Sequence, residues 1–324
     1  EAICMKLKRD NGLDYEPADV VVSNGAKHSI YNTLQALIDN GDEVIVPTPY
    51  WVSYTEMVKL NSGIPVIIPT RAEDGFKLTP EQLKTHVTDR TRAIFINTPN
   101  NPTGAVYSRK ELERLVDILV PRGIVIIADE VYEKLLYDGA VFTSVAALGS
   151  EVQNLTVTIN GVSKTYAMTG WRIGYAAAPR ELAQAMANIQ SHATSNPNSI
   201  AQKAAVVALT GDQEPVAKML AEFARRRERM VEGINTIPGL SCRKPEGAFY
   251  IFADVSKLFG KTIRGHKING SIDLTEVLLN EAHVALVPGA AFGDDRFVRF
   301  SYATSLDVIE KGLARVKAVL SEAE

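Results

Sequence analysis

Short apolar runs alternate with amphipathic stretches over residues 1–212. Five runs rich in β-branched residues stand out: Glu43–Pro47, Pro65–Pro69, Arg92–Asn97, Ile124–Asp129 and Leu155–Asn160. Runs of this length and composition are typical of buried parallel strands. Between them, Thr79 precedes Gln82 by three positions and Ser108 precedes Glu111 by three, which is the capping-box pattern of a helix start. The alternation predicts an α/β fold, a mostly parallel sheet flanked by helices.

The pattern changes after residue 212. The charged stretch Glu214–Ile237 predicts a long helix that bridges two domains. Shorter strands are expected beyond it, and a last helix from Ser305, whereas the polar segment Gly260–Gly270 predicts a loop. The expected strands are Ala248–Phe252, Val284–Val287 and Phe297–Ser301, and the apolar side of the last helix is Ile309, Leu313, Val316 and Leu320. We therefore predict a large α/β domain, residues 1–212, and an interdomain helix with a small C-terminal α+β domain, residues 213–324.

Composition narrows the classes of function. With 46% hydrophobic and 23% charged residues, the 324-residue chain has the make-up of an ordinary globular protein. A net charge of −3 without charge runs argues against nucleic-acid and anionic-membrane partners and favours small-molecule chemistry. No apolar run has the length of a bilayer span and no signal peptide is recognisable, so we expect a cytoplasmic protein. Two distant cysteines and five histidines without ligand spacing predict no metal site.

Ligands of open α/β sheets bind beyond the carboxyl ends of the strands, so the residues that follow each predicted strand are the candidates for chemistry. The run Val20–Asn24 ends at Gly25, Ala26 and Lys27, where a helix start offers free amides to a phosphate. A plain turn with a solvated lysine explains the same residues. Trp51 follows the next strand and offers a ring for stacking on a cofactor, although core packing is the simpler explanation.

Polar residues also follow the three central strands. Asn101 lies in the turn-forming segment Asn97–Gly104, where its amide is fixed for hydrogen bonding. Asp129 closes the most apolar strand, so its carboxylate needs a strong partner, which we expect to be positive, and Tyr132 adds a phenol nearby. A helix cap is the competing role for Asp129. Lys164 follows the last strand among small and apolar residues, which favour the neutral amine that an imine-forming lysine requires.

Taken together, these motifs resemble those of the fold-type I aminotransferases that depend on pyridoxal 5′-phosphate (PLP), in particular the bacterial and plastid aspartate/prephenate aminotransferase group. The resemblance covers nearly the whole chain. The matching stretches follow one another in the order of that family: Ser23–Lys27, Pro49–Tyr54, Asn101–Gly104, Asp129–Tyr132, Ser163–Lys164, Met168–Gly174 and Val298–Thr304.

The resemblance implies a role for each matching residue. Lys164 would hold PLP as a Schiff base and then move the proton between substrate and cofactor. Asp129 would pair with the pyridine nitrogen, while Tyr132 and Asn101 would donate to the phenolic oxygen of the ring and Trp51 would stack on its face. The phosphate would be held by Arg172, by the backbone of Gly25, Ala26 and Lys27, and by Ser163 in place of a serine that many relatives carry at the position of Gly161.

The substrate site implied by the resemblance consists of Lys27, Trp51, Asn101 and Arg299. Arg299 would bind the α-carboxylate and Lys27 the distal carboxylate of an acidic amino acid. The implied reaction is transamination between aspartate or glutamate and the oxo acids oxaloacetate and 2-oxoglutarate, in a homodimer. Prephenate stays an alternative substrate, because it too carries two carboxylates.

Three other readings compete with an aminotransferase. A β-lyase, decarboxylase or acyltransferase of the same fold would keep Lys164 and Asp129 and break another bond. A PLP-binding regulator without catalysis is a further alternative, although no helix-turn-helix or basic patch supports it. A nicotinamide-dependent dehydrogenase ranks last, because no G-x-G-x-x-G follows a strand.

The beginning of the chain departs from the family pattern. Glu1–Leu7 already has the composition of a helix interior, without a capping residue before it. Relatives carry a further N-terminal segment, with a glycine loop over the substrate and a tyrosine that reaches the phosphate in the neighbouring subunit. Residues 1–324 contain none of it, and we expect a molecule that began at residue 1 to bind substrate more weakly and to dimerise less tightly.

Overall fold

A seven-stranded sheet forms the centre of the computed structural model, which describes residues 1–324. The strand order is β1-β7-β6-β5-β4-β2-β3, and the predicted α/β class is confirmed. The five predicted strands lie side by side and parallel, as β2 (Glu43–Pro47), β3 (Ile64–Ile68), β4 (Thr91–Asn97), β5 (Val125–Asp129) and β6 (Thr156–Gly161). A strand that the sequence analysis missed, β7 (Gly174–Ala177), runs antiparallel between β6 and β1 (Val20–Ser23).

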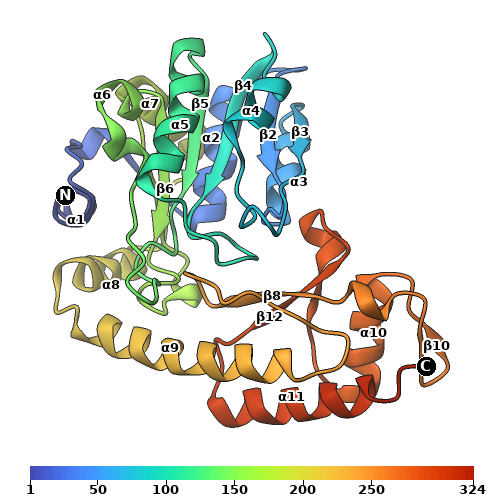
Figure 1. The fold of residues 1–324 in the computed structure, drawn as a ribbon. Helices are drawn as coiled ribbons and strands as arrows, with labels where there is room; N and C mark the ends of the chain where they lie inside the picture. Colours follow the sequence, from blue (N-terminus) through green and yellow to red (C-terminus); the bar gives the residue numbers. More distant parts are fainter.

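Helices cover both faces of this sheet (Figure 1). Alternate strand residues point to opposite faces, so Val44 and Phe95 pack into one core and Ile45 and Ile94 into the other. The first core contains α2 (Ala26–Leu37), α3 (Ser53–Leu60) and α7 (Arg180–Ala193); the second contains α4 (Pro80–His86), α5 (Arg109–Leu119) and α6 (Ser150–Gln153). Burial on both faces explains why these strands read as continuous apolar runs. The predicted capping boxes at Thr79 and Ser108 start α4 and α5.

One of the five predicted strands is less buried than expected. Strand β3 forms the edge of the sheet, and its Ile64 and Ile67 side chains are exposed. An edge strand has a neighbour on one side only, so the apolar composition of Pro65–Pro69 indicated a strand correctly but overstated its burial.

A second, three-stranded antiparallel sheet lies below the first (Figure 1). Its order is β11-β12-β8, formed by β8 (Tyr250–Asp254), β11 (Val287–Pro288) and β12 (Phe297–Ser301). The long predicted helix is α9 (Glu214–Asn235), which packs beside the last helix, α11 (Leu306–Leu320). With α10 (Ser271–Ala282) they enclose the largest core of the molecule, to which Ile309, Leu313, Val316 and Leu320 contribute as predicted.

Two predictions for this part of the chain were wrong. The segment Gly260–Gly270 is not a plain loop, because β9 (Thr262–Ile263) and β10 (His266–Lys267) pair within it as a short hairpin. Arg264 and Gly265 both have positive φ angles at its tip, the geometry of a tight two-residue turn, which the polar composition did not reveal. Strand β11 takes up only the end of the predicted Val284–Val287 run, because its single partner β12 pairs with Val287 and Pro288.

The remaining elements complete the chain. Helix α1 (Ala2–Asn11) packs against α8 (Ser199–Thr210), so the first residues are helical as expected. Six short 3-10 helices connect the longer elements: η1 (Pro17–Asp19), η2 (Val120–Arg122), η3 (Val145–Leu148), η4 (Thr169–Trp171), η5 (Ser256–Leu258) and η6 (Gly289–Phe292). None of the helices combines the length and the apolar character needed to cross a membrane.

Candidate functional site

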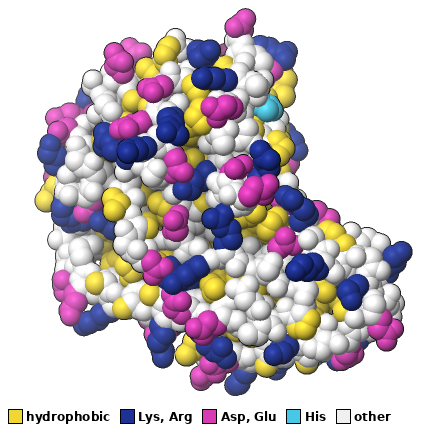
Figure 2. Space-filling view, in the orientation of Figure 1, with side chains coloured by type: hydrophobic (Ala, Val, Ile, Leu, Met, Phe, Trp, Pro, Cys, Tyr) yellow, Lys and Arg dark blue, Asp and Glu magenta, His cyan; other side chains and the backbone are white.

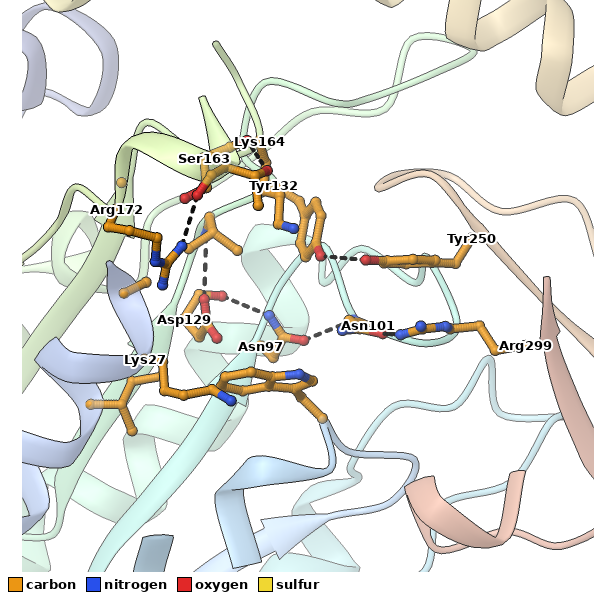
Figure 3. A pocket seen from close by; sticks show the side chains of 16 residues that line it. Lys27, Asn97, Asn101, Asp129, Tyr132, Ser163, Lys164, Arg172, Tyr250 and Arg299 are labelled. Atoms are coloured by element: carbon orange, nitrogen blue, oxygen red, sulfur yellow. Dashed lines mark hydrogen bonds between the residues drawn. The ribbon is translucent and has the colours of Figure 1, made fainter. Parts of the chain in front are cut away.

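A pocket of about 280 Å³ lies between the carboxyl edge of the large sheet and the small sheet. Figure 2 shows an indented outline where the upper and lower parts of the molecule meet. Side chains reach the pocket from α2, from the segments that follow β4, β5 and β6, and from β8 and β12. Ten of the predicted residues line it, and the eleventh, Gly25, borders it: Ala26, Lys27, Trp51, Asn101, Asp129, Tyr132, Ser163, Lys164, Arg172 and Arg299 (Figure 3).

Lys164 presents an amine without a partner. It follows β6, is half-buried, and its Nζ lies 5.9 Å from the ring centroid of Tyr132 and 5.5 Å from that of Phe249, with no carboxylate within ion-pair distance. Burial lowers the pKa of Lys164, and the positive charges of Arg299 and Arg172 lower it further, against the opposing effect of Asp129. A larger share of neutral amine follows, which is the form that attacks a carbonyl group.

Asp129 ends β5 with a buried carboxyl group. Its Oδ2 accepts a hydrogen bond from the Tyr54 hydroxyl at 2.5 Å, and its Oδ1 accepts one from the Val131 amide at 3.4 Å. Burial raises the pKa of Asp129 to about 6, although these two bonds and the charge of Lys164 oppose the rise. The carboxyl group is thus poised to gain from any cation placed beside it.

Within the protein, the side-chain hydrogen-bond partner of Asp129 is the phenol of Tyr54, and Lys164 acts on Asp129 only through its charge. The positive partner expected for Asp129 stays a prediction. Tyr54 lies in the first turn of α3, where its ring stacks on Phe95 of β4 at a centroid distance of 4.2 Å. That stacking fixes the direction of the Tyr54 hydroxyl. The sequence around Asp129 does not predict this contact, because Tyr54 is 75 positions away.

An anion-binding corner lies at the start of α2. Gly25 is the N-cap of this helix and has no side chain to cap it, so the amides of Ala26 and Lys27 have no acceptor within the helix. Arg172 lies against this turn: a Cβ atom at Gly25 would stand 2.3 Å from its Nη2 atom. A Cβ atom at Gly174 would stand 2.1 Å from the Ala26 nitrogen, so only glycine allows the approach of β7 to α2. Free amides and a guanidinium therefore converge beside Ser163 (Figure 3).

Two further cations face the pocket from different sides (Figure 3). Lys27 is exposed, and its Nζ lies 4.9 Å from the ring centroid of Trp51. Arg299, on β12, donates from Nη1 to Asn101 Oδ1 at 2.9 Å, and its guanidinium lies 4.4 Å from the ring centroid of Tyr250. Neither cation has a carboxylate partner in the protein. Because Arg299 occupies the amide oxygen of Asn101, the amide nitrogen of Asn101 stays available as a donor.

Three residues of this site were missed by the sequence analysis. Tyr54 bonds to Asp129, and the Asn97 amide bonds to the Asp129 carbonyl oxygen at 2.9 Å. The Tyr250 hydroxyl lies 2.9 Å from the Tyr132 hydroxyl (Figure 3). Tyr54 and Asn97 stand inside motifs that were recognised. Tyr250 belongs to a predicted strand of the other sheet, so only the tertiary fold brings it to the site.

Comparison with known proteins decides the family. The family model described as aminotransferase class I and II matches residues 1–316. The chain belongs to this family. An aspartate aminotransferase from Geobacillus stearothermophilus is 50% identical over 98% of the chain and 79% of its own length. An aspartate/prephenate aminotransferase from Cereibacter sphaeroides is 49% identical over 98% of the chain and 80% of its own length.

Solved structures agree with the family assignment. The crystal structure of an aspartate aminotransferase from Rhizobium meliloti superimposes with a TM-score of 0.96 at 46% identity, covering 100% of this chain and 81% of that one. The chain is therefore a PLP-dependent enzyme of the aminotransferase family, acting on small-molecule amino acids and oxo acids. The relatives give no support to a lyase, a decarboxylase or a regulator.

The residues of the pocket fit the cofactor of this family. PLP carries an aldehyde, a pyridine nitrogen and a phosphate. The pocket offers a half-buried amine without a partner at Lys164, a buried carboxyl group at Asp129, and the anion-binding corner of α2 and Arg172. The glycines at positions 25 and 174 keep that corner open at backbone level.

Proposed function

We propose that this aminotransferase exchanges the amino group between aspartate or glutamate and the oxo acids oxaloacetate and 2-oxoglutarate. The main support for these substrates is that two cations without carboxylate partners, Arg299 and Lys27, face one pocket from different sides. An acidic amino acid and its oxo acid each carry two carboxylates, which two such cations complement. An aspartate aminotransferase of similar structure from Thermus thermophilus, at a TM-score of 0.91 and 41% identity, was solved with maleate, a dicarboxylate.

The roles proposed for the cofactor-binding residues follow from their surroundings. Bound PLP supplies an electron sink for the negative charge left when the α-proton of the substrate departs. Asp129 would pair with the pyridine nitrogen and keep it protonated, since a buried carboxylate gains from a neighbouring cation. Trp51 would stack on the ring face, and Tyr132 and the Asn101 amide would donate to the phenolic oxygen. The corner formed by Gly25, Ala26, Lys27, Ser163 and Arg172 holds the phosphate.

Lys164 carries out the proton transfer in this proposal. Its amine would anchor the cofactor, and once the amino group of the substrate has freed it, Nζ would be the base that takes and carries the proton of the substrate α-carbon. The lowered pKa supports the role of base, because a neutral amine accepts a proton readily at neutral pH. Arg299 fixes the α-carboxylate and thereby sets which α-bond faces Lys164.

The main rival is a preference for aromatic substrates. An aromatic aminotransferase from Pyrococcus horikoshii also superimposes well, with a TM-score of 0.93 at 41% identity. We favour the acidic substrates because Lys27 stands at the pocket with its ammonium free. Prephenate is kept as a second candidate substrate, because the aspartate/prephenate aminotransferase from Cereibacter sphaeroides is among the relatives and prephenate also carries two carboxylates.

A Lys27→Met variant tests the substrate preference. This change keeps the backbone amide of the phosphate corner and removes only the ammonium group. We expect kcat/KM for aspartate to fall about tenfold, the low end for a charge-assisted contact because Lys27 is exposed. Activity with phenylalanine should stay unchanged. Half-reactions of the PLP-loaded protein with single amino acids, followed by the absorbance of the cofactor, measure both values.

The control for this test is Lys110→Met, which removes an exposed lysine of α5 that does not line the pocket. It should leave both substrates unaffected. Equal loss with aspartate and phenylalanine in Lys27→Met, or no loss with either, would refute the role of Lys27 and with it the acidic preference.

We also propose a homodimer and two domains divided at residues 212 and 213. The dimer is supported by Ile200 and Val207, seven residues apart on α8 and 72% and 70% exposed, which form an apolar face suited to a second copy. The division is supported by the two separate sheets and by α9 between them. The cytoplasmic location stays a prediction.

A further inference from the structure

Two tyrosines from different sheets meet at the edge of the pocket. Tyr132 follows β5 of the large sheet and Tyr250 lies in β8 of the small sheet, and their hydroxyl oxygens are 2.9 Å apart (Figure 3). The rings are packed edge to face, with centroids 5.8 Å apart and planes at 80°. Only 3% of Tyr132 and 6% of Tyr250 is exposed. Within the protein, each hydroxyl therefore has the other as its only hydrogen-bond partner.

The count of protons decides the direction of this hydrogen bond. A tyrosine hydroxyl has one proton to donate and also accepts. In the proposed function, Tyr132 donates its proton to the phenolic oxygen of the cofactor. Tyr132 then has no proton left for Tyr250, so the bond between them can only persist if Tyr250 is the donor and Tyr132 the acceptor.

We propose that Tyr250 is a positioning residue that donates to Tyr132 and thereby holds and strengthens the donor that Tyr132 presents to the cofactor. The inference rests on the proposed role of Tyr132. A hydroxyl that accepts a hydrogen bond becomes a better donor itself, since the two bonds polarise each other. No other hydrogen bond competes for the Tyr250 hydroxyl.

The charges around the pair support this direction. Burial raises the pKa of Tyr250, while its bond with Tyr132 and the positive charge of Arg299 lower it. The Arg299 guanidinium lies 4.4 Å from the ring centroid of Tyr250, so it makes the Tyr250 hydroxyl a stronger donor. Burial is the main cause that raises the pKa of Tyr132, and Tyr250 and Asp129 raise it further. Tyr132 therefore keeps its proton. Both phenols stay neutral at physiological pH.

The small sheet fixes Tyr250 relative to the substrate site. Strands β8 and β12 pair antiparallel, with Tyr250 opposite Ser301 and Arg299 opposite Phe252. Arg299 and Tyr250 are therefore carried by one rigid unit, and both make hydrogen bonds to the large part of the molecule, to Asn101 and Tyr132 respectively. Arg299, proposed to bind the substrate carboxylate, and Tyr250 are thus placed together by the packing of the small sheet against the large one.

The absorbance of the bound cofactor tests this inference without reference to turnover. The band position reports whether the linkage between Lys164 and the cofactor is protonated. Loss of that proton leaves negative charge on the phenolic oxygen uncompensated, so a donor at this oxygen favours the deprotonated form and lowers the titration midpoint. Weakening Tyr132 as a donor should therefore raise the midpoint.

Tyr250→Phe in the PLP-loaded protein is the decisive variant, because it removes one hydroxyl and keeps the ring. We expect its midpoint to rise by about half a unit to one unit, the shift that corresponds to one ordinary hydrogen bond. Tyr302→Phe is the matched control: it removes the hydroxyl of another buried tyrosine, which donates to the Ala248 carbonyl oxygen at 3.2 Å and does not line the pocket. Its midpoint should equal that of the unmodified protein.

Tyr132→Phe, alone and combined with Tyr250→Phe, separates the inference from the proposed function. We expect Tyr132→Phe to raise the midpoint more than Tyr250→Phe does, and the double variant to match Tyr132→Phe. A shift in Tyr132→Phe without one in Tyr250→Phe would overturn the inference alone, and so would additive shifts in the double variant. An unchanged midpoint in Tyr132→Phe would overturn the proposed role of Tyr132 as well. Thermal unfolding of each variant verifies that it is folded.

Discussion

Replacing Lys6 with methionine should lower the free energy of unfolding by about 3 kcal/mol, the lower end of the range for breaking a buried ion pair. Lys6 and Glu133 form an ion pair in which each side chain is only 3% exposed. The pair joins α1 to the segment that carries Asp129 and Tyr132. Methionine keeps most of the apolar stem of lysine, so the change removes mainly the ammonium group.

The magnitude follows from what remains around Glu133. Its Oε2 accepts from the Asn11 amide at 2.8 Å, and its Oε1 accepts from the Asn160 amide at 3.0 Å. These two donors compensate part of the negative charge that Glu133 keeps when Lys6 is replaced. For this reason we expect the lower end of the range for breaking a buried ion pair. Asn160 directly precedes Gly161 in the segment that leads to Lys164. Lys6→Met should therefore also weaken PLP binding, because the support of that segment is loosened.

Urea unfolding followed by circular dichroism measures the change. Lys8→Met serves as the control on the same helix, because the Lys8–Asp14 pair is exposed and should contribute less than about 1 kcal/mol. The double variant Lys6→Met/Glu133→Gln removes both charges and should recover most of the loss. Equal stability of Lys6→Met and Lys8→Met, or a double variant less stable than Lys6→Met, would refute the argument.

Two further predictions concern a buried carboxyl group and an apolar surface. Burial raises the pKa of Glu130 from 4.5 to about 8, so the folded state takes up a proton; the resulting stabilisation is complete below about pH 4.5 and is lost as pH rises through about 8. Glu130→Gln should abolish this loss of stability, measured as the difference in the free energy of unfolding by urea between about pH 5 and about pH 8. A variant with the same pH dependence as the unmodified protein would contradict the prediction. Sedimentation velocity should show a dimer that Ile200→Lys/Val207→Lys dissociates. The control Lys110→Gln, at an exposed position of α5, should leave the dimer intact, and a monomer in the unmodified protein would end the proposal.

Local patterns contained much of the fold and of the site. The five parallel strands, the helix starts at Thr79 and Ser108 and the helix α9 follow from residues within one window of sequence, because burial on two faces and capping are local properties. Residues that follow parallel strands also meet at one edge of the sheet, so the order of the motifs was enough to collect Asp129, Asn101 and Lys164 in one pocket.

What the tertiary structure alone decided are contacts between distant segments. Strand β7 contains small residues and no strong apolar run, and it becomes a strand because it fills the place between β1 and β6. Tyr54 reaches Asp129 across 75 residues, and Tyr250 reaches Tyr132 across 118. Hydrogen-bond partners of this kind depend on how elements pack, and a sequence pattern records only which faces are buried, not which side chains meet across them.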